Sequence, residues 1–79
     1  MVMKVIVYST QSCPWCYKLK DWLKENKIQF EDVDVGRDKD RAIEMVEKSG
    51  QMGVPVAEIN GQIVIGFDLP RLKELLNIK

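Results

Sequence analysis

Ser12-Cys13-Pro14-Trp15-Cys16 is the stretch around which the fold is organised, because it holds the only two cysteines of the 79-residue chain. An apolar, β-branched run, Val5-Ile6-Val7, precedes it, and Leu19, Trp22 and Leu23 follow it with helical spacing. This pattern predicts a strand, a short loop and a helix that begins at the cysteines. A Cys-x-x-Cys pair at such a junction indicates thiol–disulfide redox chemistry.

The two cysteines have different expected roles. Near a helix N-cap, backbone N–H groups lack intrahelical partners and the helix dipole is positive, so the thiolate form of Cys13 is stabilised. Pro14 suits the first helical turn, where no N–H donor is needed. Cys16 comes three residues later on the same side of that turn, within reach of Cys13 but directed more inward. We therefore expect Cys13 to be the nucleophile and Cys16 the resolving thiol.

Three charged or aromatic neighbours of the pair are also informative. Trp15 lies between the cysteines, where a buried ring would block the site, so we expect it to be exposed as a contact surface for partners. A partly buried packing role for Trp15 is the alternative. Lys18 and Lys20 add positive charge nearby, but both are expected to be solvated lysines of the helix surface.

An inert structural disulfide and a zinc site are the alternatives for the cysteine pair. So short a loop removes little entropy from the unfolded chain, which argues against a structural crosslink. Zinc takes about four ligands, and the chain has no histidine and no third cysteine. Only a dimer could complete an all-cysteine zinc site, and we expect no metal.

Length and charge restrict the classes of protein that fit. The chain predicts one small domain covering residues 1–79. Twelve acidic and twelve basic residues give a formal net charge of zero, so no partner nucleic acid and no partner membrane is expected. The first residues lack the pattern of a signal peptide. We expect a cytoplasmic protein, and there a vicinal cysteine pair is more often catalytic than structural.

Hydrophobic periodicity predicts the element order βαβαββα. The expected strands cover residues 3–8, 28–35, 54–59 and 62–65, and the expected helices cover 14–27, 39–49 and 69–76. Together they predict an α/β fold with a four-stranded mixed sheet flanked by three helices, in which strand 28–35 is a candidate edge. In helix 39–49, Ala42, Ile43 and Val46 are expected to face inward with Met45 beside them. Tyr8 is expected to be a half-buried packing residue.

Turn and capping residues punctuate this order. Asp38 and Asp68 are predicted N-caps, and Gly50 is a predicted C-cap. Asn60-Gly61 predicts a two-residue hairpin turn. Pro55 stands near the start of a strand, where proline is tolerated, and a cis bond before it would be uncommon on general grounds.

Three motifs in this order resemble the glutaredoxin family of the thioredoxin-like fold: Cys13-Pro14-Trp15-Cys16, Val54-Pro55 and Gly66-Phe67-Asp68. The resemblance covers essentially the whole chain. It implies the same roles for the two cysteines and a cis-proline at Pro55 beside them. It implies that the Val54 backbone pairs with a bound peptide or glutathione like an added strand. It also implies that the turn Gly66-Phe67-Asp68 receives the γ-glutamyl end of glutathione, since exposed N–H groups at a helix start suit a carboxylate.

The chain departs from the family pattern in three places. Thr10-Gln11-Ser12 stands where many glutathione-using members carry a lysine, Gly53 replaces a usual threonine, and Asp68-Leu69 holds one acid where two are usual. The dipeptide Gly66-Phe67 also resembles redoxins that are reduced by a thioredoxin-reductase-type flavoenzyme. The cysteine chemistry is shared by both groups, so the reductant is less firmly indicated than the reaction.

We therefore expect a thiol–disulfide oxidoreductase that reduces protein disulfides or glutathionylated proteins through Cys13 and Cys16, with glutathione as reductant and co-substrate. A redoxin that receives electrons from the flavoenzyme is the alternative. A non-enzymatic alternative is an iron–sulfur carrier in which two chains share a cluster through Cys13 and two glutathiones, although Pro14 tends to oppose this in the family.

Overall fold

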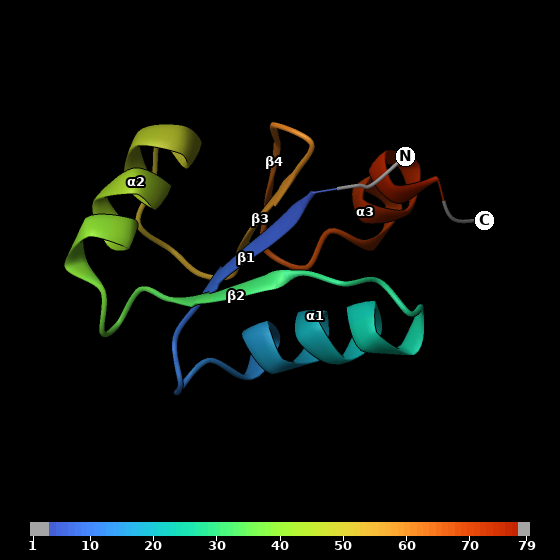
Figure 1. Cartoon of the computed structure of the whole chain (residues 1–79), viewed down its shortest axis with the longest axis horizontal. Coiled ribbons are helices and arrows are strands. Elements are labelled where there is room, and N and C mark those ends of the chain that lie inside the picture. Colours follow the sequence, from blue (N-terminus) through green and yellow to red (C-terminus); the bar gives the residue numbers. More distant parts are fainter. Residues whose placement is uncertain (1–3, 78–79) are drawn as a thin grey trace.

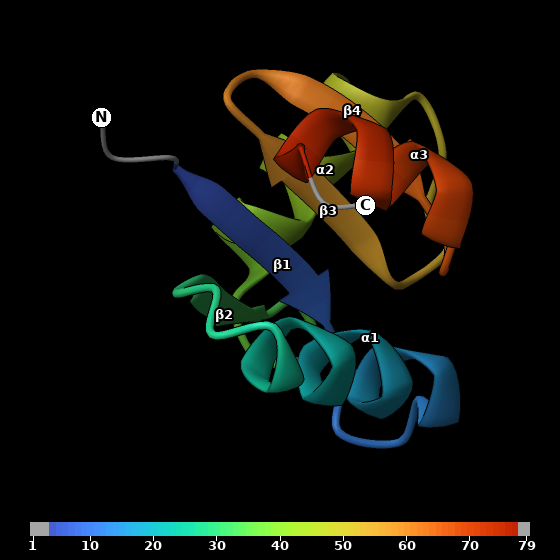
Figure 2. The same cartoon turned by 90° about the vertical axis from the view of Figure 1, so that its right-hand side faces the viewer.

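Strands and helices follow one another along the chain in the predicted order βαβαββα. The computed structural model describes residues 4–77, with β1 (Val5–Ser9), α1 (Pro14–Glu25), β2 (Glu31–Asp34), α2 (Lys39–Ser49), β3 (Val56–Ile59), β4 (Gln62–Ile65) and α3 (Leu69–Leu76). The four strands form one sheet in the order β2-β1-β3-β4, in which only β1 and β2 are parallel. Helices α1 and α3 cover one face of this sheet and α2 covers the other (Figure 1, Figure 2). The predicted mixed sheet with three helices is confirmed.

Strand β1 is buried throughout because its two faces border two separate cores. One core lies under α1 and α3 and includes Val5, Val7, Leu19, Leu23, Ala57, Ile59, Val64, Leu72 and Leu76. The other lies under α2 and includes Ile6, Tyr8, Val33, Met45 and Val56. Each fully buried aliphatic side chain contributes about 2 kcal/mol of transfer free energy, so these two layers fix the position of β1 and of the loop that follows it.

Helix α1 and strand β2 are shorter than predicted. The helix ends at Glu25, and Asn26 is its C-cap. The chain then turns through Lys27 at a φ of 59°, and the Ile28 N–H donates to the Leu23 carbonyl at 2.9 Å. Strand β2 begins only at Glu31, because its parallel pairing with β1 begins there, opposite Ile6, and covers four residues. As predicted, β2 is an edge strand.

The outer limits of two other strands also differ from the sequence-based ranges. Of the predicted strand 3–8, Met3 lies outside the described residues, and the observed strand extends to Ser9. Strand β3 starts at Val56, two residues later than predicted. The reason is the register: Val56 is the first residue of this segment that faces both Tyr8 and Ile65 across the sheet, and Pro55 has no N–H to extend the ladder.

The predicted inward face of α2 is correct for Val46, which packs against the core under this helix, and wrong for Ile43. Ile43 is 58% exposed, and Met45, at 2%, is the buried residue of this helix. The reason is that polar side chains also point to the sheet: the fully buried Tyr8 donates its hydroxyl hydrogen bond to Glu44 at 2.6 Å. Lys48 of α2 pairs with Glu58 of β3 at 3.0 Å. Tyr8 is thus more deeply buried than the half-buried residue that was expected.

The predicted caps and turns are confirmed. Asp38 accepts a hydrogen bond from the Arg41 N–H, and Asp68 accepts one from the Arg71 N–H. Gly50 ends α2 in the left-handed conformation. Asn60 and Gly61 both have positive φ, at 50° and 87°, which is the geometry of a type I′ hairpin.

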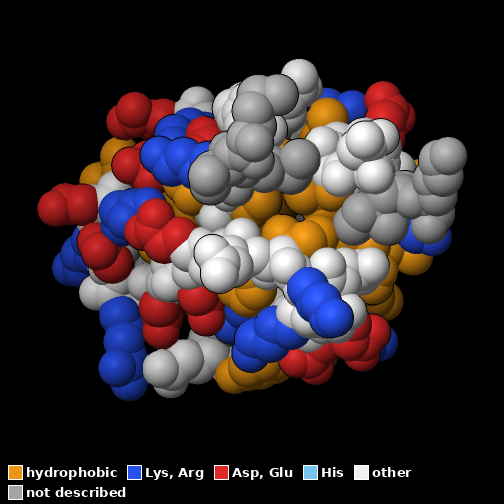
Figure 3. Space-filling view, turned by 45° about the vertical axis from the view of Figure 1, so that its right-hand side comes forward, with side chains coloured by type: hydrophobic (Ala, Val, Ile, Leu, Met, Phe, Trp, Pro, Cys, Tyr) orange, Lys and Arg blue, Asp and Glu red, His pale blue; other side chains and the backbone are white. Residues whose placement is uncertain are grey.

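The surface gives two further facts. Within residues 4–77, no helix combines the length and the apolar character needed to cross a membrane. On the face shown in Figure 3, acidic and basic side chains are interspersed rather than gathered by sign.

Candidate active site

Cys13 is the N-cap residue of α1. Its backbone is extended, with φ −103° and ψ 106°, and Pro14 occupies the first turn. The Cys13 sulfur accepts the backbone N–H of Cys16 at 3.2 Å. This N–H has no carbonyl partner within the helix, so it is free to donate to the sulfur. The local sequence therefore produces the helix-start geometry that was predicted.

Cys16 lies in a different environment from Cys13. Both residues are free thiols, but Cys13 is partly exposed and Cys16 is fully buried. Burial, followed by the hydrogen bond with Cys13, raises the pKa of Cys16 to about 12. The backbone amide of Thr10 and the charge of Lys20 act in the opposite direction. The accessible sulfur is thus the one at the helix start, and the second sulfur is held protonated at neutral pH.

The segment Val54-Pro55 lies directly against Cys13. The peptide bond between these residues is cis, as the family resemblance implied. The Cys13 thiol points to the Val54 carbonyl oxygen at 3.9 Å. On the other side, the Gly66 N–H donates to the Pro55 carbonyl at 2.8 Å. This hydrogen bond joins the end of β4 to the proline, so the second and third predicted motifs meet beside the cysteine.

A hollow of about 320 Å³ is lined by Trp15, Val54, Pro55, Gly66 and Phe67. Trp15 is 56% exposed, as expected, and its ring centroid lies 6.5 Å from that of Phe67. Phe67 also makes an edge contact with Trp22 at 6.3 Å, which ties this wall of the hollow to the core side of α1. Five of the six groove residues predicted from the sequence therefore line one surface beside Cys13.

Asp68, the sixth predicted groove residue, is exposed and caps α3 through the Arg71 N–H at 3.4 Å. It is not part of the lining just described. Its capping role is therefore visible in the structure, and its role toward a ligand stays a prediction.

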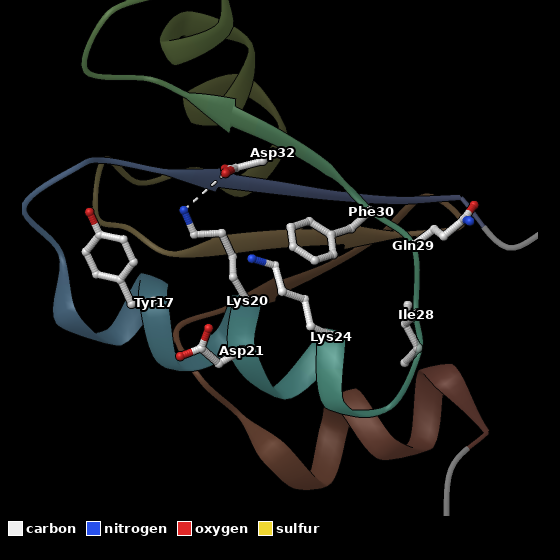
Figure 4. A pocket seen from close by; sticks show the side chains of 8 residues that line it. All are labelled: Tyr17, Lys20, Asp21, Lys24, Ile28, Gln29, Phe30 and Asp32. Carbon is white, nitrogen blue, oxygen red and sulfur yellow. Dashed lines mark hydrogen bonds and ion pairs between the residues drawn. The ribbon is translucent and has the colours of Figure 1, made fainter.

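Lys20 is the residue near the cysteines whose position was predicted incorrectly. Its side chain is only 13% exposed, contrary to the solvated position expected from the sequence, and it pairs with Asp32 of β2 at 3.1 Å. Figure 4 shows this pair at the edge of a larger hollow of about 620 Å³ between α1 and β2, which contains neither cysteine. The available signal was the four-residue spacing from Cys16, which places both side chains on one face of a helix.

Metal ligands do not gather anywhere in the part of the chain that the structure describes: no group of three or more His, Cys, Asp or Glu side chains is placed to hold an ion. The two sulfurs, the carbonyl of Val54 and the aromatic hollow are the chemical features of the site. Their arrangement suits attack by an accessible sulfur on a disulfide that is bound in extended form across Val54.

Comparisons with known proteins agree with this geometry. The glutaredoxin family model matches residues 5–64. A glutaredoxin-like 8.6 kDa protein of the rubredoxin operon of Clostridium pasteurianum is 44% identical over 70 residues, which cover 89% of this chain and 93% of that protein. The glutaredoxin-like protein NrdH of Lactococcus lactis is 36% identical over 74 residues, covering 94% and 97%.

Solved structures show the same architecture. A variant of the thioredoxin-like protein BC3987 superposes with a TM-score of 0.90 at 32% identity, covering 95% of this chain and 96% of that one. The four-stranded mixed sheet with three helices is therefore the thioredoxin-like fold of glutaredoxins.

Proposed function

This chain belongs to the glutaredoxin family, and from that premise we propose that it reduces protein disulfides and glutathione mixed disulfides through Cys13 and Cys16. The Cys13 thiolate attacks one sulfur of the substrate disulfide, forms a mixed disulfide and releases the other sulfur as a thiolate, which takes up a proton. The Cys16 thiolate then attacks the Cys13 sulfur, releases the second substrate thiol and closes the Cys13–Cys16 disulfide. Two electrons pass from the protein to the substrate.

The observation that carries this proposal is the position of the Cys13 sulfur. It accepts the Cys16 N–H at 3.2 Å, lies 3.9 Å from the Val54 carbonyl and remains partly exposed. Only a sulfur that is both ionisable and accessible can attack a disulfide. The neighbouring hollow of about 320 Å³ offers apolar contact for the substrate on the same side.

Glutathione is the reductant that we propose first. A tripeptide can lie in extended form along Val54, with its γ-glutamyl end at the start of α3. Gly66, Phe67 and Asp68 precede the first turn of this helix, and a helix start favours a carboxylate through its free N–H groups and its dipole. In this cycle glutathione attacks the mixed disulfide or reopens the Cys13–Cys16 disulfide.

A thioredoxin-reductase-type flavoenzyme is the second candidate for the reductant. The absence of a lysine in Thr10-Gln11-Ser12 and the dipeptide Gly66-Phe67 support it. So does the 36% identity to a glutaredoxin-like protein NrdH over almost the full length of both chains. The exposed Trp15 side chain and the uncharged lining of the groove also suit contact with the surface of a protein, and not only with a small anion.

Two coupled NADPH assays test the proposal with the same purified protein and the same glutathionylated or disulfide-bonded peptide. One contains glutathione and glutathione reductase, and the other contains a thioredoxin reductase. Turnover in the first assay supports glutathione, and turnover only in the second transfers the role to the flavoenzyme. The Cys13→Ser protein serves as the control in both. If the intact protein turns over in neither assay and a brown, visibly absorbing species is obtained under anaerobic purification, the oxidoreductase proposal is overturned in favour of a cluster carrier.

A further inference from the structure

Lys20, Asp32 and Ser9 form a polar cluster that joins α1 to the first two strands of the sheet. The Lys20 ammonium lies 3.1 Å from one Asp32 carboxylate oxygen and 3.5 Å from the Ser9 hydroxyl, and that hydroxyl donates to the other Asp32 oxygen at 3.0 Å. Ser9 is 2% exposed, and among residues 4–77 it is the polar residue that is classed with the buried core. Of the cations in ion pairs within residues 4–77, Lys20 is the least exposed.

This cluster shares no residue with the lining of the substrate groove, and its lysine lies on the same face of α1 as Cys16. Cys16 and Lys20 are four residues apart on α1, so they lie one turn apart on the same face. A partly open cavity of about 120 Å³ adjoins the cluster and is lined by Ser9, Thr10, Gln11, Tyr17, Lys20, Asp32 and Asp34. Thr10, which belongs to this lining, is also among the groups that lower the pKa of Cys16. The cavity is large enough for water between polar walls.

The resolution step gives a reason to place a cation there. Cys16 is fully buried, and a buried thiol resists ionisation because the thiolate loses its hydration. Yet Cys16 must lose its proton before it attacks the mixed disulfide, and it must leave as a thiolate when glutathione or another reductant reopens the Cys13–Cys16 disulfide. A nearby fixed positive charge stabilises the Cys16 thiolate both when it attacks the mixed disulfide and when it is released from the Cys13–Cys16 disulfide.

We propose that Lys20 is a positioning residue for the second half of the reaction: its ammonium, held by Ser9 and counterbalanced by Asp32, stabilises the thiolate of Cys16 and not that of Cys13. The inference rests on the proposed disulfide exchange. The proton of Cys16 leaves toward the polar cavity, the Cys16–Cys13 bond forms, and the Cys13–substrate bond breaks with its electron pair passing to the substrate thiolate. No other oxidant or reductant is needed.

Several groups determine how this step depends on pH. The charged or titratable side chains on this side of Cys16 are Tyr17 and Lys20 of α1 together with Asp32 and Asp34 of β2, with Cys13 at the helix start. The two carboxylates oppose ionisation of Cys16, and Lys20 is the cation among them. Consistent with this, the Lys20 charge lowers the pKa of Cys16 against the larger effect of burial.

Rapid mixing with dithiodipyridine, an uncharged aryl disulfide, separates the two steps. The first equivalent of thiopyridone is released when Cys13 attacks, and the second is released when Cys16 resolves the mixed disulfide. For Lys20→Met we expect an unchanged first phase, a second phase about tenfold slower at neutral pH, and a second-phase pH profile displaced upward by about one unit. Lys20→Arg should retain most of the second-phase rate.

Two further variants keep the test decisive. Lys24→Met, one turn further along α1 (Figure 4), should change neither phase. Asp32→Asn keeps the ammonium and removes its opposing charge, so its second phase should be at least as fast as that of the intact protein. Equal second phases for Lys20→Met and the intact protein, or equal slowing by Lys20→Met and Asp32→Asn, would overturn the inference. A missing first phase in the intact protein would instead overturn the proposed function.

Discussion

The Cys16 backbone N–H donates to the Cys13 sulfur across 3.2 Å, while the Cys16 sulfur itself is fully buried. One residue thus supplies both the donor that stabilises the nucleophile and the thiol that follows it in the reaction. The two sulfurs are adjacent but unequal, because one is at the helix start and the other is one turn inside it. This inequality leads to separate predictions for each cysteine.

Serine substitution of each cysteine should separate the two half-reactions. Cys13→Ser should abolish turnover, because no accessible sulfur remains to form the mixed disulfide. Cys16→Ser should retain some turnover with glutathione mixed disulfides, since glutathione can release the product from Cys13, but it should lose reduction of intramolecular protein disulfides. Mass spectrometry after iodoacetamide treatment should find the label on Cys13 of the folded protein. Equal activity of the two variants would exclude the assignment.

The rate of the resolution step should increase with pH over the whole physiological range. Burial is the largest cause that raises the pKa of Cys16, and it persists in the mixed disulfide, so the thiolate fraction of Cys16 grows about tenfold for each pH unit below that raised pKa. The second phase of thiopyridone release should therefore accelerate by roughly that factor per unit between about pH 6 and about pH 9. A plateau that begins near neutral pH would show that Cys16 is already ionised there.

Trp15 should contribute to substrate binding rather than to stability. It is 56% exposed and stands 6.5 Å from Phe67 at the groove. We expect Trp15→Ala to raise KM for a glutathionylated peptide about tenfold with little change in kcat, as for the loss of one aromatic contact. Ile43→Ala is the matched control, since Ile43 is 58% exposed on α2, across the sheet from α1. A Trp15→Ala protein with an unchanged KM would place the binding surface elsewhere.

Gly66 and Gly61 offer a paired test of the groove turn. Both have positive φ, at 75° and 87°, and an added Cβ would meet no atom within 4 Å at either site. Alanine at either position should therefore cost about 1 kcal/mol of conformational free energy and lower Tm by roughly 5 °C. Only Gly66→Ala should also raise KM, because Gly66 lines the hollow beside Pro55. Identical kinetic effects of both variants would remove Gly66 from the binding surface.

Local sequence signals were sufficient to predict the structure at positions where a single residue determines the backbone conformation. The N-cap at Cys13, the caps at Asp38 and Asp68, and the Asn60-Gly61 turn follow from short-range rules and were predicted correctly. The groove could be predicted only from the family resemblance, since it brings together segments about forty residues apart. No periodicity rule places Val54 against Cys13.

Errors arose where tertiary contacts override the pattern. In α2, apolarity alone favoured Ile43, but the sheet-facing side also accommodates Glu44, whose carboxylate meets the buried Tyr8 hydroxyl. On α1, Lys20 was expected in solvent because lysines usually are. Its partner Asp32 comes from the neighbouring strand, and a cross-element ion pair has no signature in the spacing of either segment.

The partly buried Tyr8–Glu44 hydrogen bond should make the stability of the fold depend on pH in the acid range. The Tyr8 hydroxyl, 2.6 Å from Glu44, is the main cause that lowers the pKa of this carboxyl in the folded chain. A lowered native pKa means that the stabilisation is complete above the unfolded-state value and is lost as pH falls through the folded-state value. In urea unfolding followed by tryptophan fluorescence, Tyr8→Phe should have a lower midpoint than the intact protein near pH 7, and the difference should shrink near about pH 3. Tyr17→Phe is the control, because the Tyr17 hydroxyl donates to the Gln11 carbonyl, which does not titrate. A Tyr8→Phe difference of the same size at both pH values would show that Glu44 does not carry the effect.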